Sequence, residues 1–271
     1  MPKLSIITIN LNNKDGLRKT IESVISQTFE DFEYILIDGA STDGSVEVIS
    51  QFETRLKYWI SEPDNGIYHA MNKGIKKAKG DYCLFLNSGD YLDNSTILEC
   101  IFESNHKEEL LYGNFMINGF NQTFTMPDYL SFNTFLDVSI GHHASFIKRQ
   151  LFESYGMYNE NNKIVSDWEF FILVVFKYRC SYKHINKTVS HRQEGGISID
   201  PKYHKIHMNE RNEAIKQVLP EFHDTFMDYF NLKEELHDYK SSKVIQFIRK
   251  LQKSKINKIK NNISKFRFNR N

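Results

Sequence analysis

The sequence predicts an α/β fold in which a mostly parallel central sheet is flanked by helices and followed by a helical extension at the C-terminus. Two observations carry this prediction. Strand-like and helix-like patterns alternate over the first 90 residues, and the strand-like runs are short and apolar, which is typical of buried parallel strands. The length of 271 residues, with 40% apolar and 25% charged side chains, suits one or two globular domains.

Each strand and helix predicted within the first 90 residues has its own sequence pattern. The predicted strands are the runs LSIITIN, FEYILID, LKYWIS and DYCLFL, at residues 4–10, 32–38, 56–61 and 81–86. The predicted helices between them span residues 14–27, 41–52 and 66–80. Leu17, Ile21 and Val24 recur on one face of the first helix, and Gly80 is a natural stop for the third. This order predicts a parallel sheet with helices on both faces.

The second half is less regular and is predicted more coarsely. Its expected elements are a strand over 109–117, a helix over 165–178, and a strand with a glycine-containing loop over 180–198. From about Pro201 the pattern is polar and helical. The predicted organisation is a main domain over 1–204, a helical extension over 205–240 and a basic tail over 241–271.

The charge is unevenly distributed along the chain. The formal net charge is +1, but residues 241–271 contain ten Lys or Arg and no Asp or Glu, so the first 240 residues carry +1 − 10 = −9. The near-zero total gives no reason to expect a nucleic-acid partner. Val244, Phe247 and Leu251 among the lysines favour an amphipathic helix that contacts an anionic membrane. A solvated, partly disordered tail is the alternative.

Cysteine usage and the N-terminus indicate the compartment. Cys83, Cys100 and Cys180 form no CxxC pair, and their odd number argues against a disulfide framework. The N-terminal segment has no signal-peptide pattern, and the longest apolar run, FFILVVF, is too short to span a bilayer. We therefore expect a cytoplasmic protein, with peripheral contact at the inner face of the plasma membrane through its tail.

Polar side chains stand at or just past the carboxyl ends of the four predicted strands, namely Asn10, Asp38, Glu62 and Asp90. Ligands of open α/β sheets bind beyond these ends, where the strand order reverses. Turns also favour Asn and Asp, so any one of these residues could be an ordinary turn residue. Four of them in equivalent places predict a ligand site at this edge of the sheet.

Four segments along the chain carry a family resemblance. SIITINLNN, SQTFEDFEYILIDGASTDGS, EPDNGIYHAMNKGIKKAKGDYCLFLNSGDYL and SDWEFF follow in an order that resembles family 2 glycosyltransferases, over roughly residues 1–200. The resemblance implies the GT-A nucleotide-binding fold and transfer of a sugar from a nucleotide donor with inversion at the anomeric carbon. EPDNGIYHAMNKG and FLNSGD are most similar to the branch that builds bacterial surface polysaccharides, such as O-antigens and capsules.

The resemblance also implies roles for two carboxylates. Asp90 matches the last acid of the family's Asp-x-Asp-like motif and is expected to hold Mn²⁺ or Mg²⁺ on the donor diphosphate, with Gly89 where a second acid is common. Asp167 matches the catalytic base that takes the proton of the acceptor hydroxyl. The alternatives are a turn residue for Asp90 and a helix cap for Asp167.

Further residues match donor-side and acceptor-side positions of the family. The expected donor-binding residues are Thr8, Asn10, Asp38, Asp64, Asn72, His191 and Arg192. His142 is expected near the acceptor, with a structural histidine as the alternative, and Glu169 is a second acidic candidate there. The loop HRQEGGIS resembles one that closes over a diphosphate, and a solvated loop is the alternative.

Together these residues predict an inverting glycosyltransferase that moves a hexose or amino sugar from a UDP-sugar to a polysaccharide or lipid-linked oligosaccharide. A sugar-phosphate nucleotidyltransferase is one alternative, and it should carry a Gly-rich, Arg-containing loop after the first strand. The segment TINLNNKDG is not of that kind. A non-catalytic nucleotide-sugar-binding module is the other alternative, and it would tolerate loss of Asp90 or Asp167.

Overall fold

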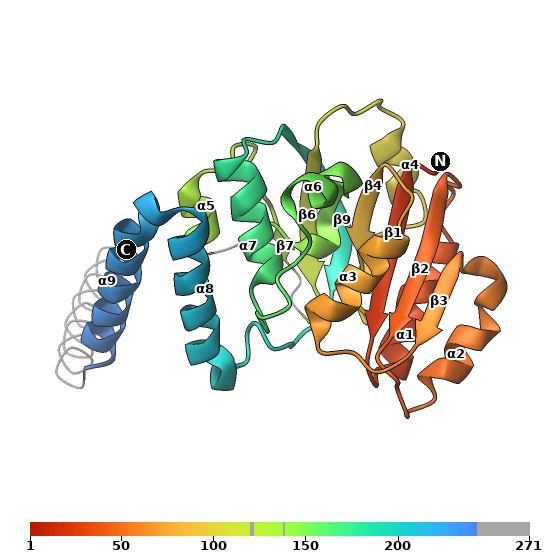
Figure 1. Ribbon diagram of the computed structural model, residues 1–271, viewed down its shortest axis with the longest axis horizontal. Helices are drawn as coiled ribbons and strands as arrows, with labels where there is room; N and C mark the ends of the chain where they lie inside the picture. Colours follow the sequence, from red (N-terminus) through yellow and green to blue (C-terminus); the bar gives the residue numbers. More distant parts are fainter. Residues whose placement is uncertain (120–121, 138, 243–271) are drawn as a thin grey trace, which may run out of the picture. The chain divides into compact units, whose positions relative to one another are not determined.

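A computed structural model describes residues 1–119, 122–137 and 139–242 of the chain (Figure 1). The chain divides into two compact units, Met1–Pro220 and Glu221–Asn271. The described part of the second unit is built on helix α9, His223–Ser241. The predicted boundaries near residues 204 and 240 stay predictions, and the basic tail lies outside the described residues from residue 243 onward.

A sheet of nine strands forms the centre of the first unit. The strands are β1 Leu4–Asn10, β2 Phe32–Asp38, β3 Tyr58–Ser61, β4 Tyr82–Phe85, β5 Tyr91–Leu92, β6 Leu110–Ile117, β7 Thr123–Phe124, β8 Ser145–Lys148 and β9 Tyr182–Arg192. Their order is β3-β2-β1-β4-β8-β6-β9-β5, with β7 paired to β6. The first four strands are parallel neighbours, as predicted, while β8 pairs antiparallel with both β4 and β6.

Helices cover this sheet (Figure 1). Those of the first unit are α1 Lys14–Ile25, α2 Ser45–Gln51, α3 Ile67–Lys77, α4 Ile97–Phe102, α5 Phe132–Asp137, α6 Arg149–Tyr155, α7 Ser166–Ile172 and α8 His204–Val218. Helix α3 packs on β1 and β2, whereas α1 contacts α2 and β5. The helix predicted over 165–178 is α7 followed by a π-helical turn, Leu173–Lys177. Among the described residues, no helix is long and apolar enough to cross a bilayer.

Burial of the parallel strands explains the short apolar runs of the sequence. Every residue of β1 is buried, and Leu4, Ile6 and Ile7 have no exposed surface, because helices and neighbouring strands cover both faces. Burying each such aliphatic side chain contributes about 1.5–3 kcal/mol. The chain moves from β1 outward to β3 and then returns to place β4 on the other side of β1. The strand order therefore reverses between β1 and β4, which is where ligands bind in such sheets.

Candidate active site

The turn after β4 is fixed by a buried hydroxyl from α1. Thr20 has no exposed surface, and its Oγ1 accepts a hydrogen bond from the Gly89 backbone N–H at 2.9 Å and donates to the Asp90 carbonyl at 2.7 Å. One side chain thus satisfies two backbone groups of the turn that carries Asp90. The position of the Asp90 carboxylate is consequently set by packing of α1 beneath it.

The Asp90 carboxylate is buried, with the whole residue 5% exposed, and it lines a cavity of about 340 Å³. Its Oδ1 accepts a hydrogen bond from the Gln193 backbone N–H at 2.9 Å. Burial raises the pKa of Asp90 to about 6, against the opposing effects of the charges of His142 and Arg192 and of that backbone hydrogen bond. A cation in the cavity would remove most of this burial penalty, so Asp90 is suited to bind one.

Gly89 has a backbone conformation that explains why no second acid stands there. Its φ is +103°, which side-chain-bearing residues rarely adopt, and a Cβ at this position would lie 1.6 Å from Gln193 Oε1. In this structure the end of the Gln193 side chain lies there, and the positive φ disfavours a second acid at this position whatever the space. Within the described residues, no group of three His, Cys, Asp or Glu could hold a metal ion. The donor set still fits a hard cation that uses one carboxylate plus phosphate and water oxygens.

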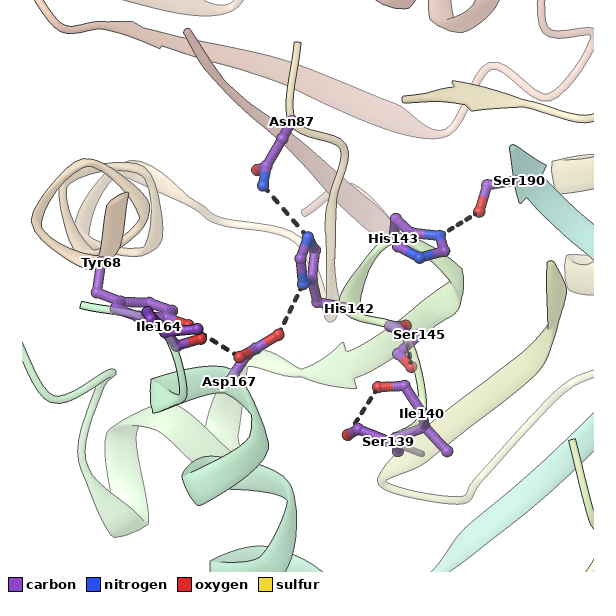
Figure 2. A network of polar contacts seen from close by, with 11 residues as sticks. Tyr68, Asn87, Ser139, Ile140, His142, His143, Ser145, Ile164, Asp167 and Ser190 are labelled. Atoms are coloured by element: carbon purple, nitrogen blue, oxygen red, sulfur yellow. Dashed lines mark hydrogen bonds and ion pairs between the residues drawn. The ribbon is translucent and has the colours of Figure 1, made fainter. Parts of the chain in front are cut away.

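The Asp167 carboxylate receives one hydrogen bond on each oxygen, as Figure 2 shows. Tyr68 OH, from α3, lies 2.9 Å from Oδ1 and also contacts the Ile164 carbonyl, while His142 Nδ1 lies 2.8 Å from Oδ2. Burial alone would raise the pKa of Asp167, but the hydrogen bond and charge of His142 and the bond from Tyr68 outweigh it, and the pKa lies below its usual value. Asp167 is therefore ionised at neutral pH.

His142 links this carboxylate to the turn after β4. Burial acts to lower the pKa of His142, but the hydrogen bond and charge of Asp167 prevail and raise it. On the other side of the ring, Nε2 lies 3.3 Å from Asn87 Nδ2 (Figure 2). Neutral His142 can carry its proton on Nδ1 toward Asp167 and accept from Asn87. By contrast, His143 faces Ser190, and burial holds its pKa well below the usual value, so it is a neutral structural residue.

Two cavities meet at Asp167 and His142. The cavity that contains Asp90 is also lined by the loop from Arg192 to Ser198. A second cavity of about 310 Å³ lies on the other side and is lined by aromatic side chains such as Phe115 and Trp168. Residues that line both are His142, Ile164, Asp167, Arg192 and Ser198. The ionised carboxylate therefore stands in the wall between two spaces, each large enough for part of a substrate.

The predicted donor-side residues at β1 and β2 form one buried network. Asp38 has no exposed surface, and it accepts hydrogen bonds from Asn10 Nδ2 at 2.7 Å and from the hydroxyls of Ser41 and Ser61 at 2.6 Å each. The helix predicted from residue 41 starts only at Ser45, because Ser41 is turned toward Asp38. Asn10 Oδ1 is buried without a hydrogen-bond partner in the described chain.

Three other predicted donor residues have partners within the protein. Thr8 is buried, with its hydroxyl 3.0 Å from that of Tyr34. Asn72 donates to the Tyr158 carbonyl and to Glu160, and accepts from the Tyr158 N–H, so it ties α3 to that segment. Asp64 Oδ1 accepts from the Gly66 N–H at 2.9 Å. Their roles in donor binding stay predictions, and the structure gives Thr8 and Asn72 a packing role.

The remaining predicted residues separate into two groups. Arg192 lines both cavities, and its Nε is buried without a partner in the described chain. His191 instead stacks on Tyr91 and lies 2.8 Å from Asp93. Glu169 bonds to Asn159 and Asn162, and in the described structure it lines neither cavity. For His191 and Glu169 the predicted contact with substrate stays a prediction.

Several residues of the site were not singled out from the sequence. They are Tyr68, Asn87, Gln193, His207 and Arg211, all of which line one of the two cavities. Tyr68 is the second residue of α3, and Asn87 stands directly before the turn of Asp90, so their proximity to predicted residues was a usable signal. His207 and Arg211 lie on α8, where the polar helical pattern gave no such indication.

Comparisons with known sequences agree with this arrangement. The model that describes glycosyl transferase family 2 matches residues 5–177. A glycosyltransferase of Mycobacterium tuberculosis is 35% identical over 179 residues, which cover 63% of this chain and 68% of that protein. A PGL/p-HBAD biosynthesis glycosyltransferase of Mycobacterium bovis is 31% identical over 208 residues, which cover 73% of this chain and 79% of that protein.

Solved structures share the fold. Residues 1–349 of TarS from S. aureus, in complex with UDP-GlcNAc, align with a TM-score of 0.64 at 18% identity, over 80% of this chain and 67% of that one. A mannosyltransferase from Pyrobaculum calidifontis, in complex with GDP-Man and Mn²⁺, aligns with a TM-score of 0.59 at 14% identity, over 83% and 68%. The predicted fold class is therefore confirmed.

Proposed function

This chain belongs to glycosyl transferase family 2, and from that premise we propose that it is an inverting enzyme that moves a sugar from a UDP-sugar to a saccharide acceptor. The observation that carries the proposal is the place of Asp167, an ionised carboxylate in the wall between the Asp90 cavity and the aromatic cavity. Direct displacement needs an acceptor hydroxyl that faces the anomeric carbon of the donor, and a base within hydrogen-bond reach of that hydroxyl.

The donor would occupy the Asp90 cavity. The UDP-GlcNAc complex of the TarS structure supports a uridine nucleotide, and the Mn²⁺ in the mannosyltransferase structure supports a divalent cation. Asp90 would hold such a cation, which would supply positive charge for the leaving diphosphate. Arg192 would add positive charge from the opposite wall, and Gln193 to Ser198 would limit the access of water.

The acceptor would enter the aromatic cavity and present its hydroxyl to Asp167. As the hydroxyl attacks the anomeric carbon, its proton passes to the carboxylate, the bond to the diphosphate oxygen breaks, and the configuration inverts. Tyr68 and His142 hold the two carboxylate oxygens, so the base is oriented before the acceptor arrives. Burial raises the pKa of Tyr68 well above its usual value, so its hydroxyl remains a donor.

We further propose a polysaccharide or lipid-linked oligosaccharide of the bacterial surface, such as an O-antigen or capsule, as the acceptor class. The Mycobacterium bovis relative is named for PGL/p-HBAD biosynthesis, which supports a role for this chain in a biosynthetic sugar transfer. The basic segment 241–271 would bring the enzyme to the inner face of the membrane. Deleting that segment should weaken binding to anionic liposomes without changing donor binding, and unchanged liposome binding would refute its role.

The test of the function is sugar transfer with matched variants. Wild type, Asp90→Asn, Asp167→Asn and the exposed control Asp15→Asn would be incubated with UDP-sugars, Mn²⁺ and oligosaccharide acceptors. Asp167→Asn should lower kcat at least a hundredfold while UDP-sugar affinity stays within about twofold, since a base contributes about 10²–10⁴. Asp15→Asn should behave as wild type. Full activity of both site variants, or specific nucleotide binding without any turnover, would contradict the proposal in favour of a binding module.

A further inference from the structure

Helix α8 lies outside the family match, which ends at residue 177, yet it contacts the segment directly before Asp167. The Glu210 carboxylate accepts three hydrogen bonds from consecutive backbone N–H groups. Oε1 accepts from Lys163 at 2.7 Å, and Oε2 accepts from Ile164 at 2.9 Å and from Val165 at 3.3 Å. A charged acceptor makes such bonds about twice as strong as neutral ones. One carboxylate therefore fixes three successive peptide units.

Those three peptide units are coupled to the catalytic carboxylate. Val165 stands directly before α7, and its carbonyl accepts from the Glu169 N–H at 2.8 Å in the first turn. The Ile164 carbonyl accepts from Tyr68 OH, the hydroxyl that also bonds to Asp167. Moving this segment would therefore shift both the backbone that carries Asp167 and the tyrosine that orients its carboxylate.

Helix α8 also contacts the chain just after Asp167. The Arg211 guanidinium lies 4.3 Å from the centre of the Trp168 ring and donates to the Phe135 carbonyl. The same α8 face contributes His207 and Arg211 to the aromatic cavity. Two adjacent residues, Glu210 and Arg211, thus hold the chain on either side of Asp167. A helix that served stability alone would not need to hold both flanks of one carboxylate.

We propose that Glu210 is a positioning residue, which holds the segment 163–165 so that the Asp167 carboxylate meets Tyr68 and His142. The proposal rests on the proposed function in that Asp167 is taken as the base. It assigns α8 to the active site and not to a separate extension. The acceptor cavity and the orientation of the base would then depend on the same helix.

The test compares Glu210→Ala and Glu210→Gln with Glu213→Ala. Glu213 lies on the exposed face of the same helix and pairs with Lys216 at 3.0 Å, so it controls for loss of a helical carboxylate. Glu210→Ala should lower kcat about tenfold to a hundredfold, because small displacements of a catalytic group have effects of this size. The KM for the donor should change less than about twofold. Glu210→Gln, which keeps one carbonyl oxygen, should lose less, and Glu213→Ala should match wild type.

A second readout does not require turnover. The pKa of His142 is raised by Asp167, so an NMR titration of its ring, assigned with His142→Gln, reports whether the carboxylate is in place. In both Glu210 variants that pKa should fall. Unchanged kcat and an unchanged His142 titration in Glu210→Ala would overturn the proposal. A loss of kcat that is matched by equal losses of donor affinity and thermal stability in the Glu210 variants would also overturn it. If wild type transfers no sugar, the proposed function fails, and the titration alone decides the positioning role.

Discussion

Replacing Thr20 tests whether the turn that carries Asp90 is held by a single hydroxyl. Thr20→Val keeps the shape of the side chain and removes Oγ1, the acceptor for the Gly89 N–H and the donor to the Asp90 carbonyl. The residue has no exposed surface, so water cannot replace the lost bonds. A buried N–H without an acceptor costs about 1–3 kcal/mol, and the lost bond to the carbonyl about 1 kcal/mol more. The free energy of unfolding should therefore fall by about 2–4 kcal/mol.

The matched control is Thr20→Ser, which keeps the hydroxyl and removes one buried methyl. Its expected cost is about 1 kcal/mol. Both variants would be compared with wild type by urea denaturation at 25 °C, and UDP binding would be titrated with and without Mn²⁺. Thr20→Val should also weaken the Mn²⁺-dependent part of UDP binding, because the turn places Asp90. A cost of Thr20→Val equal to or below that of Thr20→Ser would refute the reasoning.

Three further outcomes are expected. Asp90→Asn without divalent cation should raise the free energy of unfolding by up to about 3 kcal/mol at pH 7.5 and by almost nothing at pH 4. Burial raises the pKa of Asp90 to about 6, so the wild type loses stability as this carboxyl ionises between pH 4 and 6. Urea curves at several pH values check this, and a flat profile would contradict it. Gly89→Asp should not strengthen Mn²⁺ binding, which calorimetry with Mn²⁺ and UDP decides. It should also destabilise the protein by at least the backbone strain of a side chain at positive φ, roughly 1–3 kcal/mol. Gly156→Ala measures that strain alone, because Gly156 has φ +96° with open space around it. Asn72→Ala should lower the melting temperature by several degrees by releasing Tyr158 and Glu160, and a loss of UDP affinity at unchanged stability would instead favour its predicted donor role.

The sheet edge was predictable because its signals are local. A buried parallel strand is mostly apolar, and a polar residue at or just past its last position marks the carboxyl end, so Asn10, Asp38 and Asp90 could be placed from the sequence alone. The pairing of β8 with β4 and β6 could not be placed, because Ser145–Lys148 is a short run in the irregular middle section. Its position depends on partners far along the chain.

The connections within the site are non-local, which is why the sequence did not reveal them. Tyr68 and Asp167 are 99 positions apart, and Asp90 and Gln193 are 103 apart. No periodic pattern predicts such a pair, since periodicity reports only which face of an element is buried. The resemblance to a family identified both carboxylates. It could not show which groups orient them, or that the space beside Gly89 is filled by Gln193.

The two site carboxylates depend on groups that are synthesised much later than the sheet edge itself. Asp90 receives its backbone hydrogen bond from Gln193, and the segment before Asp167 is held by Glu210. At about 5–20 residues per second, Glu210 leaves the ribosome on the order of ten seconds after Asp90. A nascent or truncated chain that ends before Gln193 therefore contains both acids and β1 to β4, but not the groups that align them. The hydrogen bonds that hold the turn of Asp90 and the segment before Asp167 can therefore form only after Gln193 and Glu210 have been synthesised.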